Sequence, residues 1–175
     1  STANLILEIN ELTAFWHHFS ETNIPWQALK NDPDFSELDD FLNQFVDSIA
    51  LFPNLDSRLN STPVCIGFFS QTDTKTDCLF SSNFSNKSLA DAWNKLLVLL
   101  HFKENNVSQY EGVEIKIWEQ NDEKYYCAYA HEILHFSSSL PIIQSAILKS
   151  KKPHQFKNAF KKVYKTASKN QRVKI

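Results

Sequence analysis

The residues with the clearest capacity for nucleophilic chemistry are three consecutive serines, Ser137–Ser139, and two preceding histidines, His131 and His135. A nucleophilic serine often sits at a sharp strand-to-helix turn, where a histidine can take its proton. That turn needs glycines beside the serine, whereas apolar residues and a proline flank this run. Ser139 followed by Pro141 is instead typical of a helix start, with Ser139 as the N-cap. The spacing therefore favours a structural role for the serines.

Two adjacent pairs also invite interpretation as sites, His17-His18 for a metal ion and Asp39-Asp40 for acid–base catalysis. Successive side chains on a helix point about 100° apart, so neither pair converges on one ion or one substrate. Carboxylates that share acid–base work must face each other across a cleft. We therefore predict no catalytic residues and no metal ligands, and interpret both pairs as solvated helix faces.

The chain has too few glycines for a phosphate-binding loop, because Gly67 and Gly112 are the only two. Such loops need several residues that tolerate positive φ and a close approach of the backbone. The sequence therefore predicts no nucleotide cofactor, and we expect no other cofactor.

Three cysteines occur without a Cys-x-x-Cys pair, which disfavours zinc binding and thioredoxin-like redox chemistry. Cys65 and Cys78 fall in the two strands of a predicted hairpin. If Phe69 pairs with Thr74 across the turn, the two cysteines face each other and a disulfide can form. The alternative is that all three cysteines are small buried apolar residues.

The strongest local feature is a basic C-terminal quarter. All 20 acidic residues lie at or before Glu132, so residues 133–175 carry only basic charges. In this quarter, residues 154–167 predict a helix with one apolar stripe and lysines on its other faces. These lysines are Lys157, Lys161, Lys162 and Lys165.

Three roles for these four lysines remain open. The helix can pack on the core with its lysines in solvent. The lysines can also face the acidic helix over residues 34–47, although exposed ion pairs contribute only about 0–1 kcal/mol each. The third role is binding of an external anionic partner, such as lipid head groups or a polyanionic glycan. Arginine, which dominates specific nucleic-acid contacts, is scarce here, so nucleic acid is disfavoured as the partner.

Hydrophobic periodicity predicts an α+β fold, with a mainly antiparallel sheet and helices packed on one face. Strand patterns cover residues 4–9, 63–70, 76–83, 113–119, 124–131 and 133–137, and a short last strand is expected over 172–175. Helix patterns cover residues 11–19, 24–29, 34–51, 89–100, 140–149 and 154–167. Residues 63–149 read as two weakly similar ββα-type halves. We interpret residues 1–175 as one domain cut from a longer protein, because the sequence contains no Met.

Composition supports this fold class. Aromatic residues make up 13% of the chain, which predicts a well-filled core. The sequence holds no run of about 20 apolar residues, so no membrane-spanning segment is expected in it.

A pattern over residues 110–147 is similar to a known group of proteins. It consists of Tyr110-Glu111-Gly112 before a strand, a second strand with Tyr125-Tyr126, and Ser137-Ser138-Ser139 before a helix. Together with the opening apolar strand, this pattern resembles envelope-associated bacterial proteins of unknown function, chiefly from Bacteroidetes. The resemblance implies an exported location, periplasmic or on the cell surface, behind a membrane anchor outside this chain; the alternative is a cytoplasmic protein. It implies no site residues.

These observations favour a non-enzymatic binding or structural domain of an exported or envelope-anchored bacterial protein, with a protein or glycan partner in the envelope. One alternative is a hydrolase or transferase whose site is assembled from distant residues. Its first candidates are Ser137–Ser139, His131, His135 and Asp39-Asp40. The other alternative is anionic-ligand binding through the basic C-terminal helix.

Overall fold

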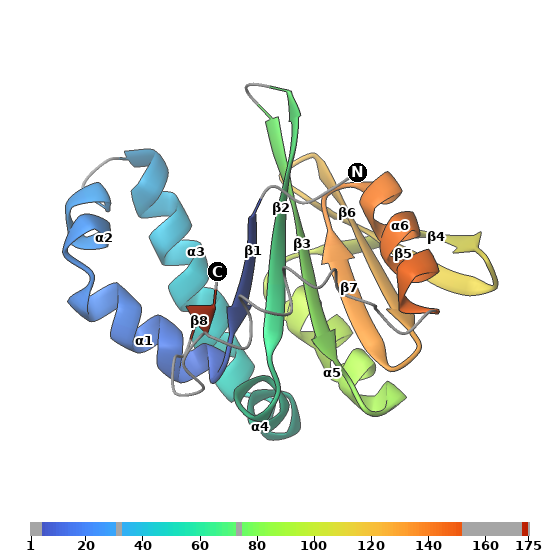
Figure 1. Ribbon diagram of the computed structural model, residues 1–175, viewed down its shortest axis with the longest axis horizontal. Coiled ribbons are helices and arrows are strands. Elements are labelled where there is room, and N and C mark those ends of the chain that lie inside the picture. The colour runs from blue at the N-terminus through green and yellow to red at the C-terminus, as the bar shows by residue number, and fades with distance from the viewer. Residues whose placement is uncertain (1–4, 31–32, 73–74, 152–172, 175) are drawn as a thin grey trace, which may run out of the picture.

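The computed structural model describes residues 5–30, 33–72, 75–151 and 173–174, and its strands form one eight-stranded antiparallel sheet (Figure 1). The strand order is β4-β5-β6-β7-β3-β2-β1-β8. The strands are β1 (Leu5–Ile9), β2 (Val64–Thr72), β3 (Lys75–Asn83), β4 (Lys103–Tyr110), β5 (Val113–Gln120), β6 (Glu123–Ala130), β7 (Ile133–Ser137) and β8 (Val173–Lys174). The helices are α1 (Leu12–Thr22), α2 (Ile24–Leu29), α3 (Pro33–Ala50), α4 (Pro53–Ser61), α5 (Lys87–Leu99) and α6 (Leu140–Ser150).

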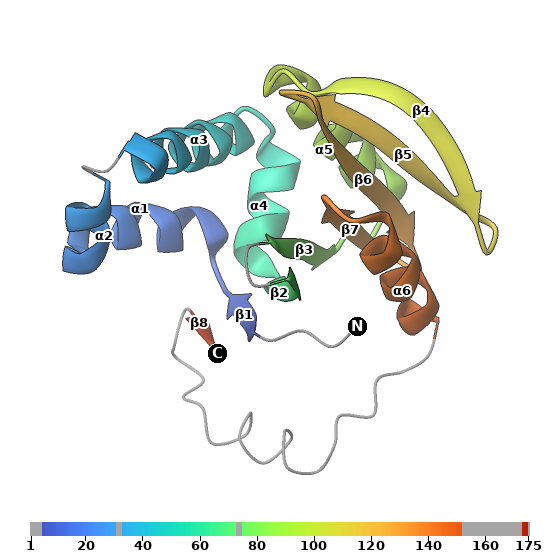
Figure 2. The ribbon, with the colours of Figure 1, turned by 90° about the horizontal axis from the view of Figure 1, so that it is seen from above.

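The larger core lies between one face of the sheet and helices α1, α3, α4 and α5, which share that side in an end-on view of the sheet (Figure 2). Its centre is Trp93 of α5, whose side chain is 1% exposed. The ring of Phe80 stacks on Trp93 at a centroid distance of 4.8 Å. Phe45 and Phe136 meet Trp93 edge-on, each at 5.8 Å. These aromatic contacts join α3 and α5 to β3 and β7, so they fix the position of α5 on the sheet.

Helix α6 covers the opposite face of the sheet (Figure 2). Its buried residues Ile143 and Ile147 pack with Ile115 of β5 and Ala128 of β6. Strands β5 and β6 also carry apolar residues on the other face, where Trp118 and Cys127 belong to the larger core. The predicted α+β class and antiparallel sheet are confirmed. The expected packing of the helices on one face holds for α1, α3, α4 and α5 but is wrong for α6. The two expected ββα-type halves therefore place their helices, α5 and α6, on opposite faces of one sheet.

Two elements lie where the sequence predicted none. Strand β4 is polar and exposed along most of its length, so it lacks the alternation by which strands are recognised. It is an edge strand with a bulge between Glu104 and Asn106, which are features that discourage pairing with another chain. Helix α4 begins with Pro53 in its first turn, a position that proline favours.

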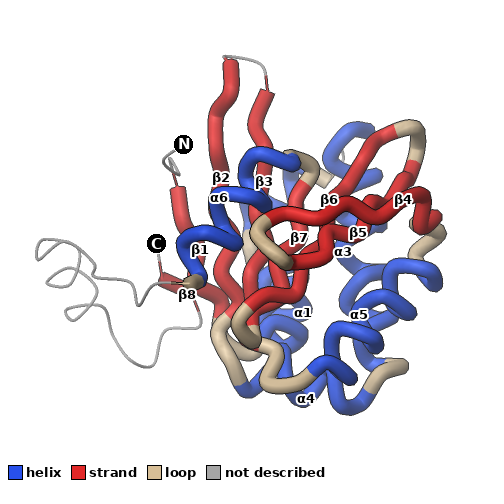
Figure 3. Tube along the Cα trace, turned by 90° about the vertical axis from the view of Figure 1, so that its right-hand side faces the viewer, coloured by secondary structure: helices blue, strands red, loops and turns tan. Residues whose placement is uncertain are grey.

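The strand register that would let Cys65 face Cys78 does not form. In the β2–β3 hairpin, which extends beyond its neighbouring strands (Figures 1 and 3), Phe69 is opposite Asp77 and Cys65 is opposite Ser81. The predicted turn lay too early in the chain, and the shift by an odd number of positions moves the two cysteines to opposite faces of the sheet. All three cysteines are free thiols.

We expect Trp93→Ala to lower the free energy of unfolding by about 3–5 kcal/mol, because it removes a large side chain from the centre of the core. Val98→Ala on the same helix is the matched control, since Val98 is 61% exposed. It should change stability by less than about 0.5 kcal/mol. Urea unfolding followed by far-ultraviolet circular dichroism measures both. Equal losses in the two variants would contradict this description of the core.

Candidate functional site

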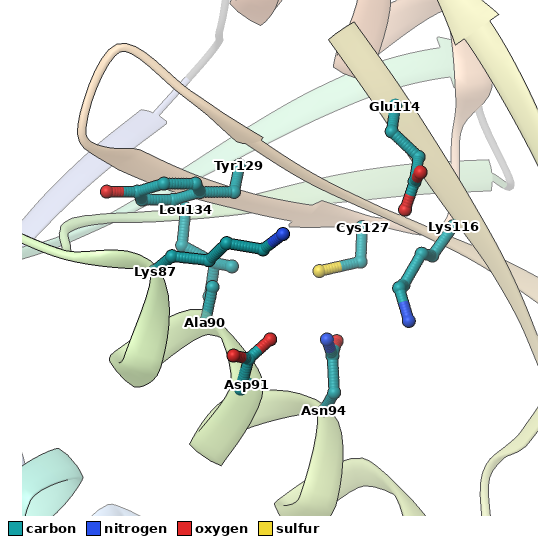
Figure 4. A pocket seen from close by; sticks show the side chains of 9 residues that line it. All are labelled: Lys87, Ala90, Asp91, Asn94, Glu114, Lys116, Cys127, Tyr129 and Leu134. Atoms are coloured by element: carbon teal, nitrogen blue, oxygen red, sulfur yellow. The ribbon is translucent and has the colours of Figure 1, made fainter.

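A pocket of about 270 Å³ opens between α5 and the strands β5, β6 and β7 (Figure 4). Its lining combines charged, amide, aromatic and apolar side chains. These are Lys87, Ala90, Asp91, Asn94, Glu114, Lys116, Cys127, Tyr129 and Leu134. None of them was singled out by the sequence as a candidate site residue.

One wall of the pocket is a single face of α5. Lys87, Ala90, Asp91 and Asn94 are spaced by three or four residues, so they line up along the first turns of the helix. Asn86 sets the helix start, because its Oδ1 accepts a hydrogen bond from the Leu89 N–H at 3.2 Å. The burial of Trp93 on another face of α5 fixes the rotation of the helix, and with it the direction of the pocket wall.

The other wall comes from the sheet. Glu114 and Lys116 alternate along β5 and both point toward α5 in Figure 4. Lys116 is opposite Cys127 of β6 in the strand register, and Tyr129 of β6 is opposite Leu134 of β7. The Tyr129 hydroxyl donates a hydrogen bond to the Phe84 carbonyl at 2.9 Å. This bond holds the aromatic ring at one end of the pocket.

The floor of the pocket is apolar and its rim is charged. Ala90, Cys127 and Leu134 form the floor and are 6%, 4% and 1% exposed. Lys87, Asp91 and Glu114 lie exposed at the rim. A surface of this kind can hold a molecule with apolar stems and charged ends, because each part then meets a group of matching chemistry.

The rim charges differ in how they are compensated. Lys116 forms an ion pair with Glu104 at 3.0 Å and lies 5.9 Å from the centre of the Trp118 ring. Within the described residues, Lys87, Asp91 and Glu114 have no ion-pair or hydrogen-bond partner. Three charged groups of the pocket are therefore available to a ligand.

Cys127 is not a reactive nucleophile in this pocket. Burial raises the pKa of its thiol to about 12, and the opposing effect of the nearby Lys116 is smaller. The thiolate is the reactive form of cysteine, so a thiol with this pKa stays neutral and unreactive at neutral pH. Cys127 contributes a small polarizable surface to the floor.

Two of the candidate serines, Ser137 and Ser138, attach the β7–α6 turn to β3. Ser137 Oγ donates to the Cys78 carbonyl at 2.6 Å and accepts from the Ser139 N–H at 3.1 Å. Ser138 Oγ donates to the buried carboxylate of Asp77 at 3.2 Å. Ser139 holds the predicted N-cap position, although its side chain makes no capping bond there. These contacts fit the structural role that the sequence favoured.

His135 contacts a serine that the sequence did not single out. Its Nδ1 lies 2.8 Å from Ser81 Oγ on the face of the sheet that α6 covers. Burial, with a further contribution from His131, lowers the pKa of His135 to about 4, so the imidazole is neutral at pH 7. Within the described residues its Nε2 has no hydrogen-bond partner. A base this weak is poorly matched to proton transfer near neutral pH.

Ser81 and His135 belong to a row of polar side chains across four neighbouring strands. In register order the row is Glu8, Cys65, Ser81 and His135. The Cys65 thiol is also neutral, because burial and the charge of Glu8 both raise its pKa. This row lies on the opposite face of the sheet from the α5 pocket, so the two sets of side chains do not combine into one site.

The interpretation of both adjacent pairs as solvated helix faces fits the histidines, whereas Asp39 is half-buried and hydrogen-bonded. Asp39 accepts a hydrogen bond from Trp26 Nε1 at 2.6 Å, while Asp40 is exposed beside it on α3. His17 and His18 are exposed on α1. Across the described ranges, no three His, Cys, Asp or Glu side chains are grouped in a way that could hold a metal ion.

The predicted anionic-partner surface, Lys157, Lys161, Lys162 and Lys165, lies outside the described residues. Nothing in the described part of the chain tests the three roles considered for it. Among the helices that the structure does describe, none has the length and hydropathy of a membrane span.

Comparisons with protein-family models, with curated protein sequences and with solved structures found no match to this chain. The chemistry of the site must therefore be argued from its own geometry.

The buried His135 predicts a specific loss of stability in acid. Because burial favours the neutral ring, an unfolded chain with an ordinary histidine pKa of about 6.5 takes up the proton first as the pH falls. The contribution of His135 is complete above about pH 6.5 and declines toward pH 4. Between pH 7.5 and 4.5 the wild type should lose about 2–3 kcal/mol more than His135→Asn, which keeps a group able to bond Ser81. Urea unfolding at the two pH values measures this, and equal losses would refute it.

Proposed function

We propose that this domain is a non-enzymatic binding domain that takes a small polar ligand in the α5 pocket. The observation that carries the proposal is the combination of a buried apolar floor with three rim charges that lack partners in the described structure. Charged residues that serve only solubility do not need to surround a common concave surface. Here Lys87, Asp91 and Glu114 surround one.

The size of the pocket limits the ligand. At about 270 Å³ it lies just below the range of roughly 300–1,000 Å³ typical of sites for drug-sized molecules. A molecule the size of an amino acid or a short peptide end fits this space better than a nucleotide or a lipid. The mixed charges of the rim also disfavour a purely apolar ligand, which would desolvate them without compensation.

Binding without catalysis is supported by the protonation state of the most central reactive group. The Cys127 thiol is held neutral, and the serine and histidine candidates lie on the opposite face of the sheet or in its turns. A hydrolase or transferase needs a nucleophile and a base within reach of one substrate. The pocket brings together charged groups of both signs over an apolar floor, which is an arrangement suited to recognition.

The exported location implied by the resemblance is a second part of the proposal. It is supported by the pattern from Tyr110 to Ser139. Fusion of alkaline phosphatase to the C-terminus of the full-length protein tests it in a bacterial host, because the phosphatase is active only after export. Phosphatase activity is the expected result, and an inactive but well-expressed fusion would contradict export.

A ligand screen by nuclear magnetic resonance tests the binding function. We expect a member of a panel of amino acids, dipeptides, nucleosides and sugars to shift backbone amide signals around Lys87–Asn94, Glu114–Lys116 and Cys127–Tyr129. Asn94→Trp should abolish these shifts, because the half-buried Asn94 lines the pocket and an indole there would occupy it.

The matched control for this screen is Lys95→Trp. Lys95 is the next residue of α5, is exposed and does not line the pocket, so the variant should bind like the wild type. A panel that leaves all the pocket amides unmoved would contradict the proposed function. Equal loss of binding in the two tryptophan variants would contradict the assignment of the site to this pocket.

A further inference from the structure

We propose that the α5 pocket binds a basic amino acid, with the carboxylate and α-ammonium group at Lys87 and Asp91 and the side-chain cation at Glu114. This inference rests on the proposed function, and it adds the chemical class of the ligand.

The charges available in the pocket are one cation and two carboxylates. Lys116 also lines the pocket, but its ammonium group is already paired with Glu104 at 3.0 Å. Lys87, Asp91 and Glu114 have no partner within the described residues. The complementary ligand therefore carries one negative and two positive groups, because each bound charge should meet an opposite one when water is displaced.

The placement of Lys87 and Asp91 matches the head group of an amino acid. The two residues are one turn apart on the same face of α5 and both line the pocket, so one bound group can contact both side chains. A lysine four residues before an aspartate is the less favourable order for a helical ion pair, and these two form none. An α-amino acid carries a carboxylate beside an ammonium group, which allows one head group to bond both residues.

The third charge lies on the opposite wall. In Figure 4 the Glu114 side chain points from β5 into the pocket, opposite the side chains of α5. Between the walls, the floor of Ala90, Cys127 and Leu134 is apolar and almost fully buried. The methylene stem of a basic side chain can lie on this floor while its terminal cation reaches Glu114.

Other small ligands leave at least one charge without a partner. A neutral amino acid leaves Glu114 uncompensated, and an acidic one brings a carboxylate against it. A diamine leaves Lys87 uncompensated. Each mismatch costs binding, because a charged group that loses water must regain an equivalent contact.

Isothermal titration calorimetry with four ligands tests this inference at low salt. The ligands are L-lysine, L-norleucine, pentane-1,5-diamine and L-glutamate. Norleucine lacks only the terminal ammonium group, and the diamine lacks only the carboxylate. We expect lysine to bind most tightly, with each of the other three weaker by about tenfold or more, the usual effect of losing a bond to a charged group.

Two variants test separately the contacts proposed for the two ends of the ligand. Glu114→Gln should weaken lysine about tenfold and leave norleucine unchanged, because only lysine reaches Glu114. Lys87→Gln should weaken lysine and norleucine alike and leave the diamine unchanged. Asp122→Asn is the control, since this exposed residue of the β5–β6 turn lies outside the pocket and should have no effect.

The outcomes distinguish this inference from the proposed function. Binding of norleucine as tight as that of lysine would overturn the class of ligand while the pocket kept its function. The proposed class of ligand would also be overturned if another compound of the wider panel shifts the amide signals of the pocket and lysine does not. If no compound in either experiment perturbs the pocket, the function and the ligand class both fail.

Discussion

The burial of Trp93 is the interaction on which the rest of the structure depends. Its ring meets aromatic side chains from α3, β3 and β7, so it fixes α5 against the sheet in both position and rotation. These contacts determine which residues of α5 face the sheet and which face the solvent. Lys87, Asp91 and Asn94 face β5 because Trp93 faces the core. The geometry of the pocket therefore follows from the packing of a residue that does not touch it.

The two faces of the sheet divide the chemistry of the molecule. Strands β5 and β6 bury apolar residues on both sides, Trp118 and Cys127 toward the larger core and Ile115 and Ala128 toward α6, so α5 and α6 pack on opposite faces of the sheet. His135 and Ser81 lie on the α6 face, where burial keeps the imidazole neutral and its hydrogen bond serves the sheet. The charges of the pocket, Lys87, Asp91 and Glu114, lie instead on the α5 face. The residues that the sequence suggested as candidates for catalysis are therefore largely different from the residues that a ligand can reach.

Much of the fold could be predicted from hydrophobic periodicity, but register and the pocket could not. The strand pattern over residues 113–119 predicted β5, and Ile115 within it is fully buried. Polar β4 had no such signal, because an edge strand buries little of its surface. The predicted register of the hairpin was wrong, and Cys65 is opposite Ser81 rather than Cys78. The position of a turn depends on backbone geometry, which the types of side chain barely indicate. The pocket joins residues from α5, β5, β6 and β7, and no local pattern reports such distant neighbours.

The charged residues of the pocket are not needed for folding. This explains why the sequence did not identify the pocket and why substitutions there can test binding without changing the fold. Lys87, Asp91 and Glu114 each look like an ordinary surface charge in the sequence, and each is exposed in the structure. Substitutions at exposed positions usually change stability by no more than about 0.5 kcal/mol. The fold therefore does not require the signs of these charges or their arrangement. Because the fold does not depend on these charges, a change in binding caused by such a substitution is due to the loss of a contact with the ligand.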